Sequence, residues 1–226
     1  RPVPGIPHLL TGDYWAENGL RFDPYVVPIG LTYGEIEPLT VDLAHIGGLG
    51  VYGRKGFGKS NLLRILLGYL QRHVFDFPSQ VYLIDSYDHQ LTEFRTFGIV
   101  EQLTIDCGDF EDILQTFADE AERRMDILRG GADLAEEPLL LCVLQNQGIY
   151  GPGAVPKPVC ERLRQLLKDA PQLKLCFLFS DVENNGEYAP PELLKVVREL
   201  GQQLLLDDLP GVKFLGSNKF TPAELK

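Results

Sequence analysis

The segment Gly53-Arg54-Lys55-Gly56-Phe57-Gly58-Lys59-Ser60 constrains this chain more than any other, because it fits the phosphate-loop pattern G-x-x-x-x-G-K-[S/T]. The pattern carries weight only where a strand ends and a helix begins. Here the apolar stretch 47–52 precedes it, and the segment 61–73 that follows carries a leucine stripe at helical spacing. The sequence therefore predicts a strand, a phosphate loop and a helix, in that order.

The residue types of this loop suit phosphate chemistry. Glycines let backbone N–H groups turn inward, and the helix that begins near Lys59 presents its positive dipole end. Lys59 is expected to bridge the β- and γ-phosphates, and Ser60 to ligate Mg²⁺ held by the nucleotide. Lys55 could touch phosphate or point to solvent, and Phe57 could stack on a base or pack beside the loop. The residues expected to contact ATP are Gly53, Lys55, Gly56, Phe57, Gly58, Lys59, Ser60 and Asn61.

Strand and helix patterns alternate along the rest of the chain, which predicts the α/β class with a mainly parallel sheet. We expect strands at 25–30, 39–43, 47–52, 81–85, 139–144, 175–179 and 211–215. Helices are expected at 61–73, 110–125, 158–167 and 191–206. Residues 1–24 suggest an arm or interdomain linker, and residues 25–226 a single domain. Because the chain opens without Met, we interpret it as a piece of a longer protein.

Charge and cysteine content narrow the class of protein. The net charge is −11 and the isoelectric point is about 4.8, which disfavours DNA as the main partner. The four cysteines form no C-x-x-C pair, and Cys142 and Cys176 lie in apolar runs. Reduced, buried thiols in a cytosolic compartment are therefore expected.

The carboxylates that P-loop ATPases use for hydrolysis are in doubt. Such enzymes usually carry Asp-Glu after an apolar strand, to hold the Mg²⁺ shell and polarise water. The strand that follows the loop helix ends in Asp85, but the next one is better placed and ends in Gln145-Asn146. Amides lack the charge and basicity of carboxylates, so hydrolysis is expected to be weak or absent. Asp181 or Glu183 could compensate, and restoring both acids at 145 and 146 would raise hydrolysis.

Four blocks together resemble the FtsK/SpoIIIE family of RecA-like P-loop ATPases. They are the P-loop, the strand Val81–Asp85, the helix block Glu120–Met125 with its Glu-x-Glu-Arg-Arg pattern, and the strand Leu175–Phe179 running into Ser180-Asp181. Active members carry Asp-Glu where this chain has Gln145-Asn146, and Thr-Gln where it has Ser180-Asp181. Two drifted signatures resemble the degenerate C-terminal ATPase domain of the EssC/EccC coupling proteins of type VII secretion, as does the entry segment 28–31.

That resemblance implies a RecA-like fold, a parallel sheet sandwiched by helices, and a domain that holds ATP with little turnover. It also implies a cytoplasmic position in a membrane-anchored bacterial protein with other FtsK-like domains in the same chain. Small secreted proteins of the WXG100 type or their relatives would be the substrates, and a hexamer is possible in the full-length protein. The position of a substrate pocket does not follow from any motif.

Two alternatives remain open at this point. One is a working motor ATPase that translocates DNA or protein, and the other is a structural domain whose P-loop is empty. Arg123 and Arg124 could supply an arginine to a neighbour's nucleotide, although adjacent charges on a helix more commonly form a solvated face.

Overall fold

The structure, a computed structural model, describes residues 25–31, 37–53, 55–182 and 191–206, without the side chains of residues 181 and 182. The arm expected for 1–24 and the strand expected at 211–215 therefore lie outside the described residues.

The main sheet has six strands, and every neighbouring pair of them is parallel. In spatial order they are β5 (Val100–Thr104), β4 (Ser79–Ile84), β6 (Leu139–Gln145), β7 (Leu175–Val182), β3 (Gly48–Tyr52) and β8 (Gln202–Leu205). Separately, β1 (Val26–Leu31) and β2 (Pro38–Asp42) form an antiparallel pair. The predicted α/β class with a mainly parallel sheet is confirmed.

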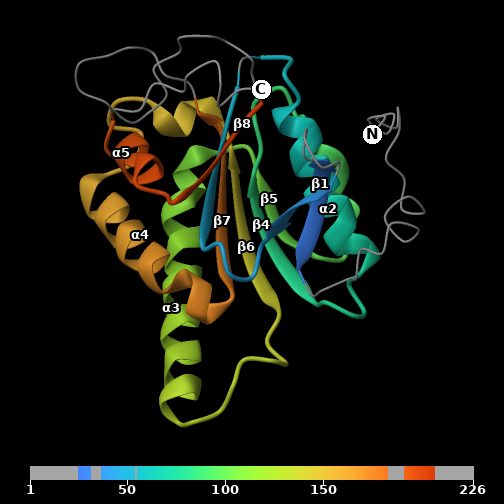
Figure 1. The fold of residues 1–226 in the computed structure, drawn as a ribbon. Helices are drawn as coiled ribbons and strands as arrows, with labels where there is room; N and C mark the ends of the chain where they lie inside the picture. The colour runs from blue at the N-terminus through green and yellow to red at the C-terminus, as the bar shows by residue number, and fades with distance from the viewer. Residues whose placement is uncertain (1–24, 32–36, 54, 183–190, 207–226) are drawn as a thin grey trace.

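Helices cover both faces of this sheet (Figure 1). The helices α3 (Phe110–Arg129), α4 (Lys157–Asp169) and α5 (Glu192–Arg198) lie on one face, while α2 (Lys59–Arg72) lies on the other beside β1 and β2. Short 3₁₀ segments, η1 to η4, span Thr92–Thr96, Cys107–Asp109, Gln147–Tyr150 and Ala170–Leu173. Two apolar clusters form the core, one on each face of the sheet.

Buried apolar side chains explain why these segments pair as they do. Every residue of β6 is buried, as expected for a strand in the middle of a parallel sheet. The predicted leucine stripe of α2 is buried against the sheet, and so is the predicted apolar stripe of α3. Cys142 and Cys176 lie fully buried on adjacent strands, and burial raises the pKa of both thiols.

The C-terminal part of the described chain differs from the prediction. The helix expected at 191–206 ends at Arg198, and Gln202–Leu205 forms β8, which pairs in parallel with β3. Gly201 interrupts the helical stripe, and the backbone ladder to β3 replaces the hydrogen bonds that a longer helix would have made. The prediction was wrong because apolar side chains alone cannot show where a buried helix gives way to a strand.

Arg124 also departs from its expected role. Its side chain is fully buried, so the solvated face predicted for the arginine pair is wrong at this position. The guanidinium donates to the Glu120 carboxylate at 2.6 Å and to the carbonyl oxygens of Leu173 and Pro138 at 2.7 and 2.9 Å. Arg124 therefore ties α3 to the segments that lead into β6 and β7.

Arg123 stays half-exposed and bonds the carboxylates of Glu120 and Glu137. Bonding to Arg123 lowers the pKa of both carboxyls. Both arginines thus serve the fold.

Candidate functional site

The carboxyl ends of the parallel strands meet at one edge of the sheet, where open α/β proteins place their ligands. The phosphate loop follows β3, Asp85 follows β4, Gln145 ends β6, and Ser180 lies in β7 opposite Gln145 in register. This edge therefore collects the phosphate loop and the predicted strand-end positions, whereas the helix block Glu120–Met125 lies on α3 with Arg124 at the segments that lead into β6 and β7.

The backbone of the phosphate loop needs glycine at two positions. Gly56 and Gly58 have φ angles of +89° and +93°, which L side chains rarely adopt. Gly58 is also the N-cap of α2, and glycine has no side chain with which to cap the first turn. The N–H groups of that turn thus face the loop as a site for an anion.

Lys59 lies at the centre of the loop. Its side chain is only 5% exposed, and Nζ donates to the carbonyl oxygen of Gly53 at 2.5 Å. The ammonium group thus lies folded across the loop, where a phosphate oxygen could replace the carbonyl as its acceptor.

A cavity of about 760 Å³ opens over the loop and the first turns of α2. Its volume lies in the range of small-molecule sites. Three cationic side chains line it, those of Lys55, Lys59 and Arg64, against the single exposed carboxylate of Asp88. The other lining residues are Gly56, Gly58, Ser60, Asn61, Ser86, Tyr87, Gln90, Asn146 and Gln147.

The cavity brings together most of the predicted contact residues: Lys55, Gly56, Gly58, Lys59, Ser60 and Asn61. Gly53 and Phe57 belong to the same loop but do not line the cavity, and Phe57 is 39% exposed. Of the two alternatives for Phe57, stacking on a base therefore has no support from the cavity.

The Ser60 hydroxyl is engaged by two glutamines. It donates a short hydrogen bond to Gln90 Oε1 and accepts one from Gln145 Nε2 at 2.7 Å. Gln145 Nε2 also lies 3.3 Å from Gln90 Oε1, so the three side chains form a closed polar group. Gln145 Oε1 is buried without a hydrogen-bond partner among the described residues.

Asn146 is committed to the fold. Its Nδ2 donates to the carbonyl oxygens of Asp85 and Ile105, at 2.9 and 3.2 Å, and its Oδ1 accepts from Gly148 N at 3.0 Å. The side chain joins the ends of β4 and β5 to the start of η3, which leaves its amide no donor for a ligand.

Asp85, the other predicted carboxylate position, is also closed off. Oδ1 accepts from the backbone N of Ser86 at 2.8 Å, and Oδ2 from the backbone N of Leu91 at 3.0 Å and Thr92 Oγ1 at 3.3 Å. The carboxylate is fully buried and shapes the loop between β4 and η1.

Ser180, at the predicted sensor position, is fully buried, and its Oγ has no partner among the described residues. The Asp181 side chain and Glu183 lie outside the described residues, so compensation by either acid stays a prediction.

Among the cavity residues that carried no signal in the sequence are Arg64, Asp88 and Gln90. Arg64 donates to the Gln90 carbonyl at 2.5 Å and to Glu93 Oε1 at 2.8 Å, which fastens the loop after β4 to α2. Gln90 Nε2 donates to Asp88 Oδ2 at 2.8 Å. Bonds from Gln90 and Ser86 lower the pKa of Asp88, which therefore stays ionised at neutral pH.

The magnesium ion that a P-loop implies does not fit these side chains. Mg²⁺ prefers carboxylate oxygens and water beside the phosphates. At Ser60 the neighbours are amides, and the described residues contain no group of three or more His, Cys, Asp or Glu that could hold a metal.

No protein-family model and no curated protein matches the chain. Solved structures do. The chain is similar to EssC (ATPases 2 and 3) from Geobacillus thermodenitrificans, with 15% identity and a TM-score of 0.62 over 90% of this chain and 38% of that one. It is also similar to EccC (ATPases 2 and 3) from Thermomonospora curvata, solved with a signal sequence peptide, with 20% identity and a TM-score of 0.63 over 91% and 37%.

A third similar structure is the pCW3 conjugation coupling protein TcpA with ATPγS, with 17% identity and a TM-score of 0.53 over 82% of this chain and 55% of that one. At these identities the likeness shows the fold, that of the RecA-like P-loop ATPases. The chain spans little more than a third of the length of the EssC and EccC structures.

Proposed function

We propose that this chain is a nucleotide-binding domain of a secretion-coupling ATPase, one that holds ATP and hydrolyses it weakly or not at all. The carrying observation is a phosphate loop whose lysine faces an open cavity, while the neighbouring strand β6 presents Gln145 and Asn146. The loop chemistry supports binding, and the missing carboxylates argue against turnover.

The electrostatics of the cavity support an anionic ligand through Lys59 in particular. Lys55 and Arg64 line the same cavity, and each lies near a carboxylate, Asp88 at 4.0 Å and Glu93 at 2.8 Å. Lysine beside backbone N–H groups at a helix start is the arrangement that binds phosphates in P-loops. This proposal for ATP does not include bound Mg²⁺, because the described side chains near Ser60 do not supply carboxylate ligands for it.

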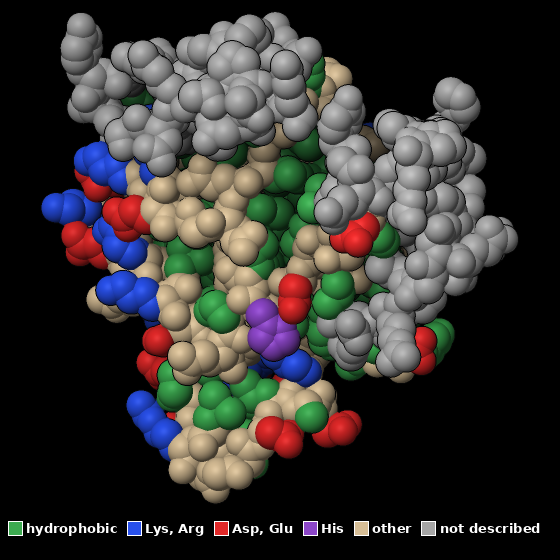
Figure 2. Space-filling model, in the orientation of Figure 1, with side chains coloured by type: hydrophobic (Ala, Val, Ile, Leu, Met, Phe, Trp, Pro, Cys, Tyr) green, Lys and Arg blue, Asp and Glu red, His purple; other side chains and the backbone are tan. Residues whose placement is uncertain are grey.

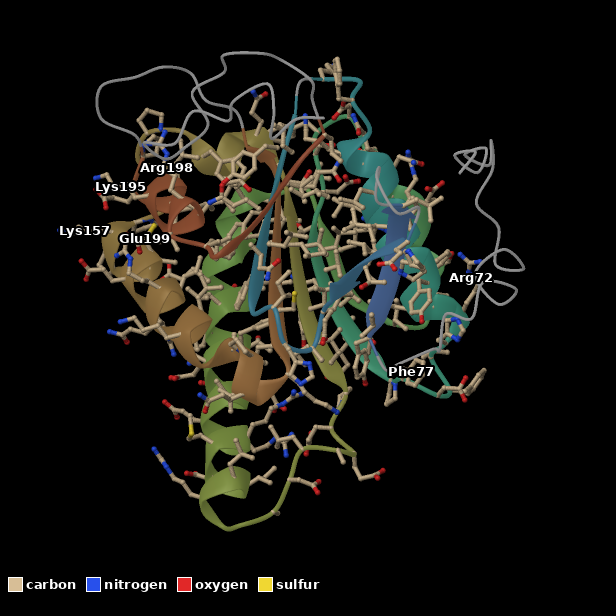
Figure 3. All side chains as sticks on the ribbon, in the orientation of Figure 1. Arg72, Phe77, Lys157, Lys195, Arg198 and Glu199 are labelled. Carbon is tan, nitrogen blue, oxygen red and sulfur yellow. The ribbon has the colours of Figure 1, made fainter. Side chains whose placement is uncertain are left out.

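The basic residues of α4 and α5, on the face of the sheet away from α2, do not form a free cationic surface. Lys157, Lys195, Arg198 and Glu199 gather on α4 and α5, away from Arg72 and Phe77 on the α2 side (Figure 3). Acidic neighbours pair several cations there: Lys195 with Glu192, Arg164 with Glu199 and Lys157 with Glu161. Figure 2 shows both charge signs interspersed along this edge. A phosphodiester backbone would find little net attraction there, which supports the expectation that DNA is not the partner.

The protein's partners belong to the same proposal. The EssC and EccC structures of similar fold each contain two ATPase domains, and the EccC structure holds a signal sequence peptide. We therefore expect this domain, 25–226 behind an arm at 1–24, to contact sister domains of its own chain and small secreted substrates of the WXG100 type, with a hexamer possible in the full-length protein.

Localisation follows from the same proposal, as the cytoplasmic part of a membrane-anchored parent. None of the helices in the described ranges has the length and apolar character needed to cross a bilayer.

Calorimetric titration of the chain with ATP tests the proposal. Wild type should bind, and Lys59→Ala should weaken binding by about 2–5 kcal/mol, roughly thirtyfold or more in Kd, because the phosphates lose their buried cation. Lys168→Ala, an exposed lysine on α4, is the matched control and should bind like wild type. Urea titration of each variant checks that the fold is kept.

Absence of binding in the wild type would contradict the proposal and favour an empty, structural P-loop. Phosphate release well above background would instead favour the motor alternative. A Lys59→Ala variant that binds as tightly as wild type would show that the ligand lies elsewhere.

A further inference from the structure

Two side-chain amides engage the Ser60 hydroxyl, which in a P-loop would be the metal ligand. A hydroxyl offers one proton and two acceptor sites. Here the proton goes to Gln90 Oε1, and one acceptor site takes the Gln145 Nε2 hydrogen at 2.7 Å. Gln145 turns the N–H end of its amide toward this hydroxyl, and an N–H group repels a cation. Neither amide carries the negative charge of the carboxylates that Mg²⁺ prefers, so this arrangement opposes metal binding.

Among the described side chains, the same edge of the sheet also offers little negative charge to hold a divalent cation. The Asp85 carboxylate is fully buried and accepts from Ser86, Leu91 and Thr92. Asn146 turns its Nδ2 toward two carbonyl oxygens. Asp88 is the remaining carboxylate in the cavity, and it accepts from Gln90 and lies 4.0 Å from Lys55 Nζ.

Cationic side chains line the cavity and could neutralise the phosphates in place of a metal ion. Lys59 and Lys55 line the cavity on the loop side, and Arg64 lines it from the second turn of α2. Together with the N-terminal end of α2, they can offset phosphate charge that a metal would otherwise neutralise.

We propose that the site binds a nucleoside triphosphate without Mg²⁺, the Gln90 and Gln145 side chains occupying the position where a P-loop holds its metal. This inference rests on the proposed function, because it describes how the same cavity takes its nucleotide. It also gives a second reason to expect weak hydrolysis, since the metal would be absent in addition to the catalytic base.

Titration with ATP in excess EDTA and in excess Mg²⁺ separates the possibilities. The proposal predicts Kd values that agree within about threefold, a difference of less than 1 kcal/mol. Binding that is more than about tenfold weaker in EDTA would overturn it while leaving the proposed function standing. Binding in neither buffer would instead overturn the proposed function, and this inference with it.

A gain-of-function variant tests the physical cause. Gln145→Glu keeps the shape of the side chain and adds a carboxylate beside Ser60. Mg²⁺ should then strengthen ATP binding by about tenfold or more, since a carboxylate and a hydroxyl now share the metal. Gln102→Glu is the control, because Gln102 lies exposed on the edge strand β5, and it should gain no Mg²⁺ effect.

Two further variants decide the ambiguous cases. If Gln145→Glu fails to fold, Gln90→Glu places the charge beside the same hydroxyl from a surface loop, with the same expected gain. If wild type prefers Mg²⁺ and Asp88→Asn abolishes that preference, Asp88 is a metal ligand and the inference is wrong. A folded Gln145→Glu without any Mg²⁺ effect would likewise contradict it.

Discussion

At the scale of single residues, two adjacent arginines have different energetic weights. Arg124 is fully buried and bonds a carboxylate and two carbonyl oxygens, while the Arg123 side chain is 48% exposed and bonds only carboxylates. A buried ion that loses its partner is far more costly than an exposed pair that separates. The two positions therefore form a matched pair within one helix.

We expect Arg124→Met to lower the free energy of unfolding by about 3–5 kcal/mol, because the buried carbonyl oxygens of Leu173 and Pro138 lose their donor and Glu120 keeps only its exposed partner Arg123. Arg123→Met should cost no more than about 1 kcal/mol. Urea denaturation followed by circular dichroism measures both. Equal losses of unfolding free energy in the two variants would show that the burial of Arg124 does not add to its contribution to stability.

Site residues could be predicted when a short sequence motif contains them, and not when a long-range contact places them. Lys59 and Ser60 could be placed from eight consecutive residues, because loop geometry and chemistry are encoded together. Gln90 could not, since it comes from a polar loop thirty residues away from Ser60. Its position depends on Arg64, which fastens that loop to α2, and no short motif encodes such a contact.

At the scale of elements, the ends of β4, β5 and β6 are joined by one amide. Asn146 lies 1% exposed and bonds Asp85 O, Ile105 O and Gly148 N. The sequence marked it as a lost catalytic acid, whereas the structure gives it a role that an acid could not fill. A carboxylate there would face two carbonyl oxygens with no proton to donate.

Asn146→Asp should therefore destabilise the fold by about 2–4 kcal/mol, measured by urea titration. The exposed change Gln102→Glu adds the same charge and should stay within about 0.5 kcal/mol of wild type. The sequence alone predicts that the pair Gln145→Asp with Asn146→Glu raises hydrolysis. Because of the Asn146 contacts, we now expect the pair to lose stability without gaining hydrolysis. A stable pair with raised phosphate release would contradict this view of Asn146.

Elements were predictable where burial was continuous. The all-apolar β6 and the stripes of α2 and α3 gave clear periods, and all three lie where expected. The edge strand β5 was missed because Glu101 and Gln102 face solvent and leave it no apolar run. At the other edge, β8 was mistaken for helix because its leucines continue the spacing of α5.

At the scale of the whole molecule, the reactivity of the four free cysteines can reveal whether the protein unfolds locally or globally. Cys142 and Cys176 lie in the middle of the sheet, on neighbouring strands, while Cys107 is partly buried near the start of α3. Burial raises the pKa of the Cys107 thiol as well, so none of these three is activated.

Thiol labelling of the native protein at pH 7.5 should modify Cys107 first. Cys142 and Cys176 should react slower than in urea by about a thousandfold or more, since they are exposed only by global unfolding. Mass spectrometry of labelled peptides over time measures the rates. Rapid labelling of the two central cysteines would mean that the sheet opens locally.

The place of β3 between β7 and β8 has a consequence for synthesis of the protein. Leu49 pairs with Leu178 on one side and with Gln202 on the other. Strand β3 therefore cannot pair in the sheet until β7 and β8, which come much later in the sequence, have been synthesised. At about 5–20 residues per second, the ribosome needs roughly 8–30 seconds to make the intervening chain. During that interval the phosphate loop has been translated but lacks the sheet that positions it. A nascent chain stalled before β7 should therefore not bind ATP.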